Sequence, residues 1–424
     1  MKLTRLKNYK SSIPVVLDRK TRKDCRIFHS EELNRMIDEN IAAVRRDGYA
    51  ELAVPPRLHP IRRECVSENA LRVADKLLEA GYRVCLCGGA VRDLLREEEV
   101  NDFDFTTDAT NEQLAALFDG IRFFTIPTGH CFSYLEFGDE VVDVATFANI
   151  PAAYKGLPHV PDFDETALYS GSLLFDAFQR DLTCNMLYYD MATGEVIDFF
   201  GGLYCLREGI IDTVIPGPVS LRMDSRRAIR AVRFAARFGF ELSDALDAAL
   251  RAEGPEYMRR LKPASAALEL PDFYSGGYAR SGTEMLLEYG MFGELFPAVR
   301  DKTENPNYIL YALQTAMGAD WLYEEGTWAL PMIVMAALLW PAVHDAGEAG
   351  AENPAEQVFN TQRAVMDMSE KDAEYFLATL SLVGTISRSR EEIRRDTQEI
   401  FEKPEFKEGL RMLGLHYLAF RDRM

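Results

Sequence analysis

No apolar run in this chain of 424 residues is long enough to cross a membrane. The most apolar stretch, WALPMIVMAALLWPAV at 328–343, is shorter than the roughly 20 residues of a membrane span and holds two prolines. We therefore expect a buried helix there and no membrane partner. The start of the chain, MKLTRLKNYKSS, is basic but lacks the apolar segment of a secretory signal peptide.

Paired cysteines of the kind that build zinc sites or disulfide frameworks are also lacking. The seven cysteines include no C-x-x-C pair, and their number is odd. This pattern is typical of free thiols in a reducing compartment. We expect a cytoplasmic protein with no disulfide-linked partner.

Positive charge is scarce, since 48 Lys and Arg face 67 Asp and Glu for a net charge of −19. The imbalance is uneven: residues 1–30 carry nine Lys and Arg against two Asp, whereas residues 281–424 carry 13 against 24 Asp and Glu. A basic amino end on an acidic body either contacts phosphates or is a solvated, partly disordered arm. The sequence leaves both interpretations open.

The length of the chain suggests roughly two to four domains. Residues 1–60 are polar and irregular, apart from one expected helix around SEELNRMIDENIAAVRR. Strand and helix patterns then alternate, and after about residue 215 only helical patterns between Gly- or Pro-bearing turns remain. The pattern predicts an α/β head followed by an all-helical remainder.

Several segments of the head carry specific predictions. Ser67 and Gly81 bound an expected helix at 67–82, and RVCLCGG predicts a short buried strand that leads into the helix GAVRDLLREEE. DFDFTT predicts the next strand. CFSYLEF and EVVDVATF predict a hairpin, and LTCNMLYYD with GEVIDFF predicts a further strand pair.

Two aspartates stand two residues apart in VNDFDFTTD at 100–108. On a strand, Asp102 and Asp104 would point to one face while Phe103 and Phe105 point to the other. Two neighbouring carboxylates repel each other, so they either hold a metal ion or lie at an exposed edge where water screens them. The spacing alone does not decide between these.

A glycine pair lies where a strand hands over to a helix, a short distance upstream. Gly88 and Gly89 would let phosphates approach the backbone beside Arg92 and a helix N-terminus. With the two aspartates nearby, this predicts a phosphate cradle facing metal ligands, and Mg²⁺ suits carboxylates plus phosphate oxygens. A two-ion site usually needs a third carboxylate, for which Asp143 in VVDVATF is the candidate.

Four segments in this order resemble class II nucleotidyltransferases: CGGAVRDLLREEEVNDFDFTTDAT, RDLTCNMLYYD, VIDFFGGL and RMDSRRAIRAVRFAARFGF. That superfamily holds the bacterial poly(A) polymerases and the tRNA CCA-adding enzymes, and HPIRRECVSENALRVADKLLEAGY is more similar to the poly(A) polymerase branch. The resemblance runs from about residue 59 to 300. It implies a basic amino-terminal extension at 1–60, a nucleotidyltransferase head (a small mixed sheet with flanking helices) at 61–214, a helical neck at 215–280, and an all-α body and tail at 281–424.

The resemblance also implies roles for residues of the head. Asp102 and Asp104 would hold Mg²⁺ at a catalytic site that includes Asp143. The triphosphate of the nucleotide would be received by Gly88, Gly89 and Arg92. A second motif, formed by Arg180, Asp181 and Asn185, would lie near the nucleotide and its ribose.

Asp224 and Arg227 match the pair that reads the incoming base in that superfamily. A carboxylate accepts from an exocyclic amine, and a guanidinium donates to ring acceptors. Adenine and cytosine both carry such an amine, so ATP, with or without CTP, is the expected substrate. Without the resemblance, Asp224 would be interpreted as the N-cap of the arginine-rich helix that follows it.

That helix carries arginines at i, i+4, i+7 and i+11, opposite Ile229, Val232 and Ala236. The stripe is either a track for polyphosphate or RNA, or a solvated face paired with nearby glutamates. On the first interpretation Arg230 would contact the nucleotide, and the RNA would be contacted by Arg226, Arg233 and Arg237.

The chain departs from the family pattern at several supporting positions. Met223 replaces a glutamate, Cys205 an aspartate, and three arginines are replaced by Asp212, Ala148 and Gln179. The double-arginine signature of the poly(A) branch is absent from FFTIPTGHCF. These changes leave open which RNA is extended.

The preferred hypothesis is a template-independent enzyme that adds AMP from ATP to the 3′ hydroxyl of an RNA, either mRNA-like or tRNA. CCA addition to tRNA is the alternative within the same class of enzyme. A catalytically weak RNA-binding relative is less favoured, because the D-x-D pair is intact.

Overall fold

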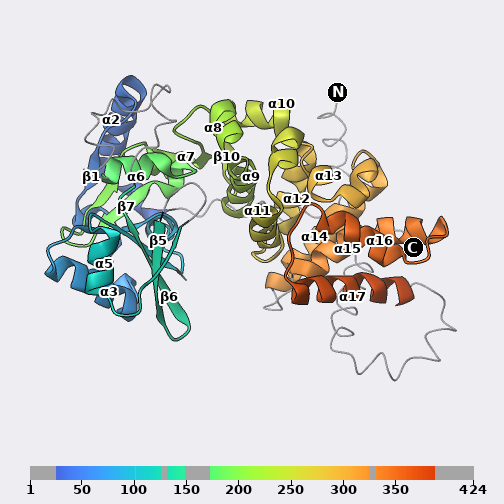
Figure 1. Ribbon diagram of the computed structural model, residues 1–424. Coiled ribbons are helices and arrows are strands. Elements are labelled where there is room, and N and C mark those ends of the chain that lie inside the picture. Colours follow the sequence, from blue (N-terminus) through green and yellow to red (C-terminus); the bar gives the residue numbers. More distant parts are fainter. Residues whose placement is uncertain (1–24, 101, 126–130, 149–171, 325–330, 387–424) are drawn as a thin grey trace. The chain divides into compact units, whose positions relative to one another are not determined.

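The computed structural model describes residues 25–100, 102–125, 131–148, 172–324 and 331–386. The chain divides into two compact units, a head unit at 22–217 and a helical unit from Pro218 onward. In Figure 1 the large sheet belongs to the blue-to-green part of the chain, whereas the yellow-to-red part is helical.

One mixed sheet of eight strands forms the frame of the head unit, with the order β1-β8-β7-β2-β3-β6-β5-β4. Only β3 and β6 pair in parallel, and the other neighbours are antiparallel. The strands are β1 (Leu52–Val54), β2 (Val84–Cys87), β3 (Phe103–Thr107), β4 (Arg122–Thr125), β5 (Cys131–Phe137), β6 (Glu140–Thr146), β7 (Leu187–Asp190) and β8 (Val196–Asp198).

Short helices connect and flank these strands. Ser67 begins α3 by accepting the N–H of Ala70, and Thr110 and Gln113 form a capping box at the start of α5. The helices are η1 (Arg26–His29), α2 (Glu31–Asp47), η2 (Pro56–Leu58), η3 (Arg63–Cys65), α3 (Glu68–Glu79), α4 (Gly89–Leu95), α5 (Asn111–Leu117), α6 (Leu173–Gln179), η6 (Thr183–Asn185) and α7 (Gly202–Glu208), with a short strand, β9 (Ile210–Ile211), after them.

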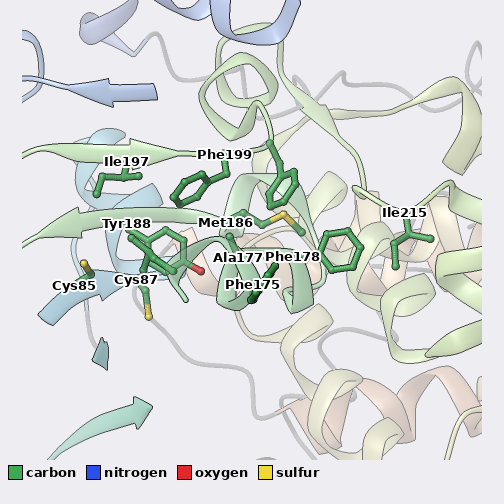
Figure 2. Packing of buried hydrophobic residues seen from close by; sticks show 12 residues of the cluster. Cys85, Cys87, Phe175, Ala177, Phe178, Met186, Tyr188, Ile197, Phe199 and Ile215 are labelled. Atoms are coloured by element: carbon green, nitrogen blue, oxygen red, sulfur yellow. The ribbon is translucent and has the colours of Figure 1, made fainter. Parts of the chain in front are cut away.

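A hydrophobic cluster joins α6 to the centre of the sheet (Figure 2). Phe175 and Phe178 of α6 pack with Tyr188 of β7 and Ile197 of β8, and Cys87 of β2 lies in the same cluster. Burial of these large side chains fixes α6 against the strands. The polar residues at the ends of α6, β2 and β7 are therefore held in place by the core.

The helical unit begins with α8 (Gly217–Met223) and the arginine-rich α9 (Arg226–Phe238). It continues through β10 (Glu241–Leu242), α10 (Asp244–Arg260), α11 (Pro263–Glu269), η7 (Pro271–Tyr274), α12 (Ala279–Glu288), α13 (Phe292–Leu295), η8 (Pro297–Lys302), α14 (Pro306–Glu324), α15 (Pro331–Glu348), α16 (Pro354–Arg363) and α17 (Glu370–Ile386). The apolar segment singled out in the sequence lies mostly in α15, whose residues from Ile333 to Trp340 are all buried. None of the helices that the structure describes is long and apolar enough to span a membrane.

The structure confirms both strand pairs expected from the sequence, since β5 pairs with β6 and β7 with β8. The first residues of LTCNMLYYD differ, because they form the 3₁₀ turn η6 before β7 begins. Two strands of the large sheet, β1 and β4, were not anticipated, and neither were the two-residue strands β9 and β10. One of them, β1, lies within the range expected to be an extension and pairs with the edge of the sheet through β8.

Candidate functional site

The two parallel strands of the head unit bring acidic residues together. Asp104 of β3 is the register partner of Asp143 of β6, and Asp102 lies one residue before β3. Phe103 and Phe105 are buried, so the aspartates leave the opposite face of the strand, as predicted.

The electrostatics of these carboxylates reflect their closeness. Burial, then the charges of Asp143 and Asp102, raise the pKa of Asp104 to about 6, and Arg180 partly opposes this shift. Burial and the charge of Asp102 also raise the pKa of Asp143. Burial and neighbouring negative charge thus make Asp104 and Asp143 harder to ionise, and a bound cation relieves this situation.

Three aspartate carboxylates form a donor set that fits Mg²⁺, which prefers oxygen ligands and is usually held by one or two carboxylates plus phosphate oxygens. In the part of the chain that the structure describes, no three His, Cys, Asp or Glu side chains form a ready-made metal cage. Asp102, Asp104 and Asp143 are the residues that would hold the ion.

The glycine turn lies beside this face, between β2 and α4. Gly88 has φ 70° and ψ −128°, a conformation open to glycine, and its N–H donates to the carbonyl of Leu187 at 3.0 Å. A Cβ atom on Gly88 would lie 2.8 Å from Nη1 of Arg180. Gly89 follows as the first residue of α4. The guanidinium of Arg180 is therefore close against the turn that is expected to receive phosphates.

Arg180 is held in this position by a buried network. Its Nε donates to the hydroxyl of Tyr188 at 2.9 Å, and its Nη2 donates to Asp176 at 3.1 Å and to the sulfur of Cys87 at 2.9 Å. The carboxylate of Asp176 also accepts from Tyr188 at 2.7 Å and from Thr106 at 3.3 Å. Asp176 thus links Arg180 to β3 and β7.

The side chain of Arg92 contacts other side chains of the head unit rather than solvent. Its side chain is buried and donates to both oxygens of Asp93, at 2.7 and 2.9 Å, and to Oδ1 of Asn185. Asn185 in turn donates to Asp181 at 3.1 Å. Arg92 therefore ties α4 to η6, and the turn, Arg92 and the RDLTCN segment form one connected structure.

The residues expected to read the base lie in the helical unit: Asp224 between α8 and α9, and Arg227 in the first turn of α9. Asp224 accepts the backbone N–H of Arg226 at 3.0 Å, and the guanidinium of Arg226 contacts both carboxylate oxygens at 2.9 to 3.2 Å. Burial disfavours the charge, but Arg226 outweighs it and lowers the pKa of Asp224. Arg227 is buried and donates to Ser220 at 2.8 Å.

The arginine stripe of α9 is largely engaged in ion pairs within the unit. Arg230 and Arg233 both contact Glu269, at 3.0 Å, and Arg233 also contacts Asp272 at 2.8 Å. Arg233 is buried, and the guanidinium of Arg237 lies over the ring of Phe238. The pairing with acidic side chains agrees with the second interpretation of the stripe, although Arg233 is not solvated.

Known proteins share this chain's sequence pattern. Residues 84–212 match the family described as the poly A polymerase head domain. Poly(A) polymerase I of Escherichia coli O6:H1 is 33% identical over 333 residues, which cover 74% of this chain and 68% of that protein. The chain belongs to this family.

The CCA-adding enzyme of Bacillus subtilis is a relative with 30% identity over 242 residues, 57% of this chain and 58% of that protein. Among solved structures, the Thermotoga maritima CCA-adding enzyme complexed with tRNA has a TM-score of 0.58 and 19% identity, covering 84% of this chain and 80% of that one. At that identity the likeness concerns the fold. Both branches named from the sequence are thus found among the relatives.

At several positions that depart from the family pattern, the residue forms a hydrogen bond with a neighbouring segment. Cys205 is buried and accepts from the hydroxyl of Thr183 at 3.1 Å, and the backbone carbonyl of Asp212 accepts from the N–H of Thr183 at 3.0 Å. Ala148 donates its N–H to Asp176 at 3.4 Å. Gln179 is half-buried at the end of α6, and Met223 is exposed at the end of α8.

Sequence reasoning missed Asp176, the residue that organises Arg180. Its i, i+4 spacing from Arg180 is a detectable signal, because such pairs meet on one face of a helix. The partnership with Tyr188 and Thr106 carries no such signal, since those residues come from other strands. The segments 126–130 and 149–171, which include part of FFTIPTGHCF, lie outside the described residues.

Proposed function

We propose that this member of the family is a template-independent RNA nucleotidyltransferase that adds AMP from ATP to an RNA 3′ hydroxyl. In this reaction the 3′ oxygen bonds to the α-phosphorus of ATP and the bond from that phosphorus to the pyrophosphate breaks. The observation that carries the proposal is the register of Asp104 with Asp143, next to Asp102 and beside the turn that packs against Arg180.

Within this proposal the metal site is formed by Asp102, Asp104 and Asp143, which would hold two Mg²⁺ ions. Bound Mg²⁺ would supply charge neutralisation at the attacking and leaving oxygens. The raised pKa of Asp104 supports this assignment, because a site built for a dication carries excess negative charge without it.

The protein's own groups bind and orient the nucleotide. The turn at Gly88 and Gly89 gives phosphates access to the backbone, and Arg180 provides a positive charge held at that place by Asp176. Arg92, Asp181 and Asn185 keep the neighbouring segment in position. Asp224 and Arg227 would select the base, with Arg230 next to them, because an ionised carboxylate accepts from an amine and repels a carbonyl oxygen.

Poly(A) polymerase I among the relatives supports AMP addition. The CCA-adding relatives keep a second candidate function, CCA addition to tRNA, in consideration. We give RNA contact by Arg226, Arg233 and Arg237 a secondary part. Arg226 is paired with Asp224 and Arg233 with Asp272, which reduces the positive charge that these two arginines offer to RNA.

One assay distinguishes the candidates. Labelled ATP, CTP, GTP or UTP is supplied with Mg²⁺ and either an unstructured RNA or a tRNA that lacks its terminal CCA. We expect AMP to be added to the unstructured RNA and GTP and UTP to be rejected, with the discrimination reduced in Asp224→Ala. Addition of a short C-C-A sequence to the tRNA alone would establish the second candidate, and no transfer to either RNA would refute the proposal.

A further inference from the structure

Three N–H groups of Arg226, from its backbone, its Nε and its Nη2, contact the carboxylate of Asp224. Oδ1 accepts the backbone N–H of Arg226 at 3.0 Å and its Nε at 3.2 Å. Oδ2 accepts Nε at 3.2 Å and Nη2 at 2.9 Å. We call this arrangement the Arg226 clamp.

The Arg226 clamp fixes the direction of the carboxylate as well as its charge. A guanidinium that contacts both oxygens sets the plane of the carboxylate, and the backbone N–H fixes its position along the chain. The side chains remain accessible, with exposed fractions of 50% for Arg226 and 32% for Asp224. A carboxylate has about four acceptor sites. The three N–H groups of Arg226, with Nε shared between the two oxygens, leave about one of these sites for a ligand while the clamp is closed.

The partner in base reading is fixed as well. Arg227 is buried and donates to Ser220, which is itself fully buried, and its N–H donates to the carbonyl of Asp224. The other charges that act on Arg226 are Arg230 and Glu269. Neither member of the pair can change direction without breaking contacts within the helical unit.

A fixed acceptor cannot serve adenine and cytosine equally. In cytosine the amine-bearing ring is attached directly to the sugar, whereas in adenine a second ring lies between them, so the two amines lie at different distances from the sugar. A hydrogen bond tolerates only about 2.7–3.2 Å between the nitrogen and the oxygen. An acceptor that serves both bases must move, and the clamp opposes that movement.

We infer that Arg226 is a specificity-determining residue whose two-point hold on Asp224 restricts the protein to one of the two amine-bearing nucleotides. The inference rests on the proposed function for the assignment of Asp224 and Arg227 to base reading. Combined with that proposal, the favoured nucleotide is ATP and the rejected one is CTP. An RNA tail made of one kind of nucleotide requires such a restriction.

The test compares Arg226→Met and Arg226→Lys with the wild-type protein, measuring equilibrium binding of ATP and CTP with Mg²⁺ as well as their incorporation into RNA. Met removes the clamp, and Lys keeps the charge but, as a single ammonium group, lacks the fork that contacts both oxygens. Both variants should lower the ATP-to-CTP preference by roughly three- to tenfold, because a half-exposed pair is worth little more than that. Discrimination against GTP and UTP should persist.

Arg222→Met is the matched control. Arg222 forms a similar half-exposed, two-contact pair with Glu253 in the same unit, and it has no part in the proposed site. This variant should keep the wild-type preference. Equal binding of ATP and CTP by the wild type would overturn the inference. An unchanged ATP-to-CTP preference in Arg226→Met would also overturn it. If the Met variant fails to fold, the same result in Arg226→Lys would do so.

The readouts separate the inference from the proposed function. A shift in the binding preference without transfer of any nucleotide would support the clamp and refute the transferase. AMP transfer with a preference that neither variant changes would support the transferase and refute the clamp. If Arg226→Lys alone behaves as wild type, charge is sufficient and the two-point hold is refuted.

Discussion

Asp104 and Asp143 are partner residues of the only parallel strand pair in the large sheet of the head unit. Because partners in register point to the same face, the two carboxylates lie side by side, with Asp102 one residue before β3. Burial, together with the charges of these neighbours, raises the pKa of Asp104. The arrangement concentrates negative charge next to the glycine turn of β2 and α4.

The first prediction concerns this carboxylate pair. Asp104→Asn should abolish nucleotide transfer, with a loss on the order of a thousandfold, because it removes an oxygen ligand that no neighbour replaces. Stability at pH 7 should be unchanged or higher, since the ionised form of a group with a raised pKa disfavours the folded state at neutral pH. Steady-state transfer and thermal denaturation measure the two effects.

Mg²⁺ provides the control for that experiment. The ion should raise the melting temperature of the wild type, because a ligand that binds only the folded state stabilises it. It should do so much less in Asp104→Asn, while Asp139→Asn, at the exposed turn between β5 and β6, should behave as wild type. Full transfer by Asp104→Asn, or an equal Mg²⁺ effect in both proteins, would rule out the assignment.

The second prediction concerns Asp176, which we regard as a positioning residue. Asp176→Asn keeps the size of the side chain but removes the charge that holds Arg180, so the KM for ATP should rise about tenfold or more with a smaller effect on kcat. Tyr188→Phe removes one hydrogen bond to Arg180 and one to Asp176, and should show a weaker form of the same change. A purely structural role would lower stability and leave the KM of the folded fraction unchanged.

Much of the head could be predicted from local patterns, and the reasons are physical. Alternation of Phe103 and Phe105 with the aspartates specified the face of β3, and the hydroxyl cap Ser67 specified where α3 begins. The pairing of β3 with β6 involves residues that are about 40 positions apart, as the register of Asp104 with Asp143 shows. Such pairing depends on how the whole sheet is assembled, which a periodicity cannot encode.

The partners of the arginines were the least predictable part. The spacing of the stripe on α9 indicated a common face, but the choice of Glu269 and Asp272 as partners depends on the return of α11 and η7 to that helix. In the same way Arg92 resembled a phosphate ligand by position, whereas its contacts with Asp93 and Asn185 bury it. Sequence spacing identifies which side chains share a face, and tertiary structure decides what neutralises them.

The third prediction concerns pH. His59 is buried, its Nε2 lies 3.1 Å from the carbonyl of Gly194, and burial is the main cause that lowers its pKa to about 4. A lowered histidine pKa means that the unfolded state binds the proton first, so stability is lost as the pH falls from about 6.5 toward 4. Between pH 7 and pH 5 the loss from this group should be about 2 kcal/mol.

Denaturant unfolding of the wild type and His59→Gln at both pH values isolates this contribution. The variant should be less stable at pH 7, since a glutamine does not reproduce the packing against Tyr189, but its stability should fall less on acidification. Identical pH dependence of the two proteins would show that His59 keeps an ordinary pKa in the folded state.

The last prediction uses two glycines that share a positive φ but differ in their surroundings. Gly81 and Gly88 have φ values of 86° and 70°, so Gly→Ala at either position should cost about 1 kcal/mol or more of stability from backbone strain. A Cβ atom on Gly81 meets nothing within 4 Å, whereas on Gly88 it would lie 2.8 Å from Nη1 of Arg180. The guanidinium would have to leave the position that Asp176 and Tyr188 give it. Gly88→Ala should therefore lower kcat/KM for ATP by at least about tenfold, since small displacements of a binding group have effects of that size. Gly81→Ala, assayed at a temperature where both variants are folded, should keep wild-type transfer. Equal activity of the two variants would mean that the contact between Gly88 and Arg180 has no part in binding the nucleotide.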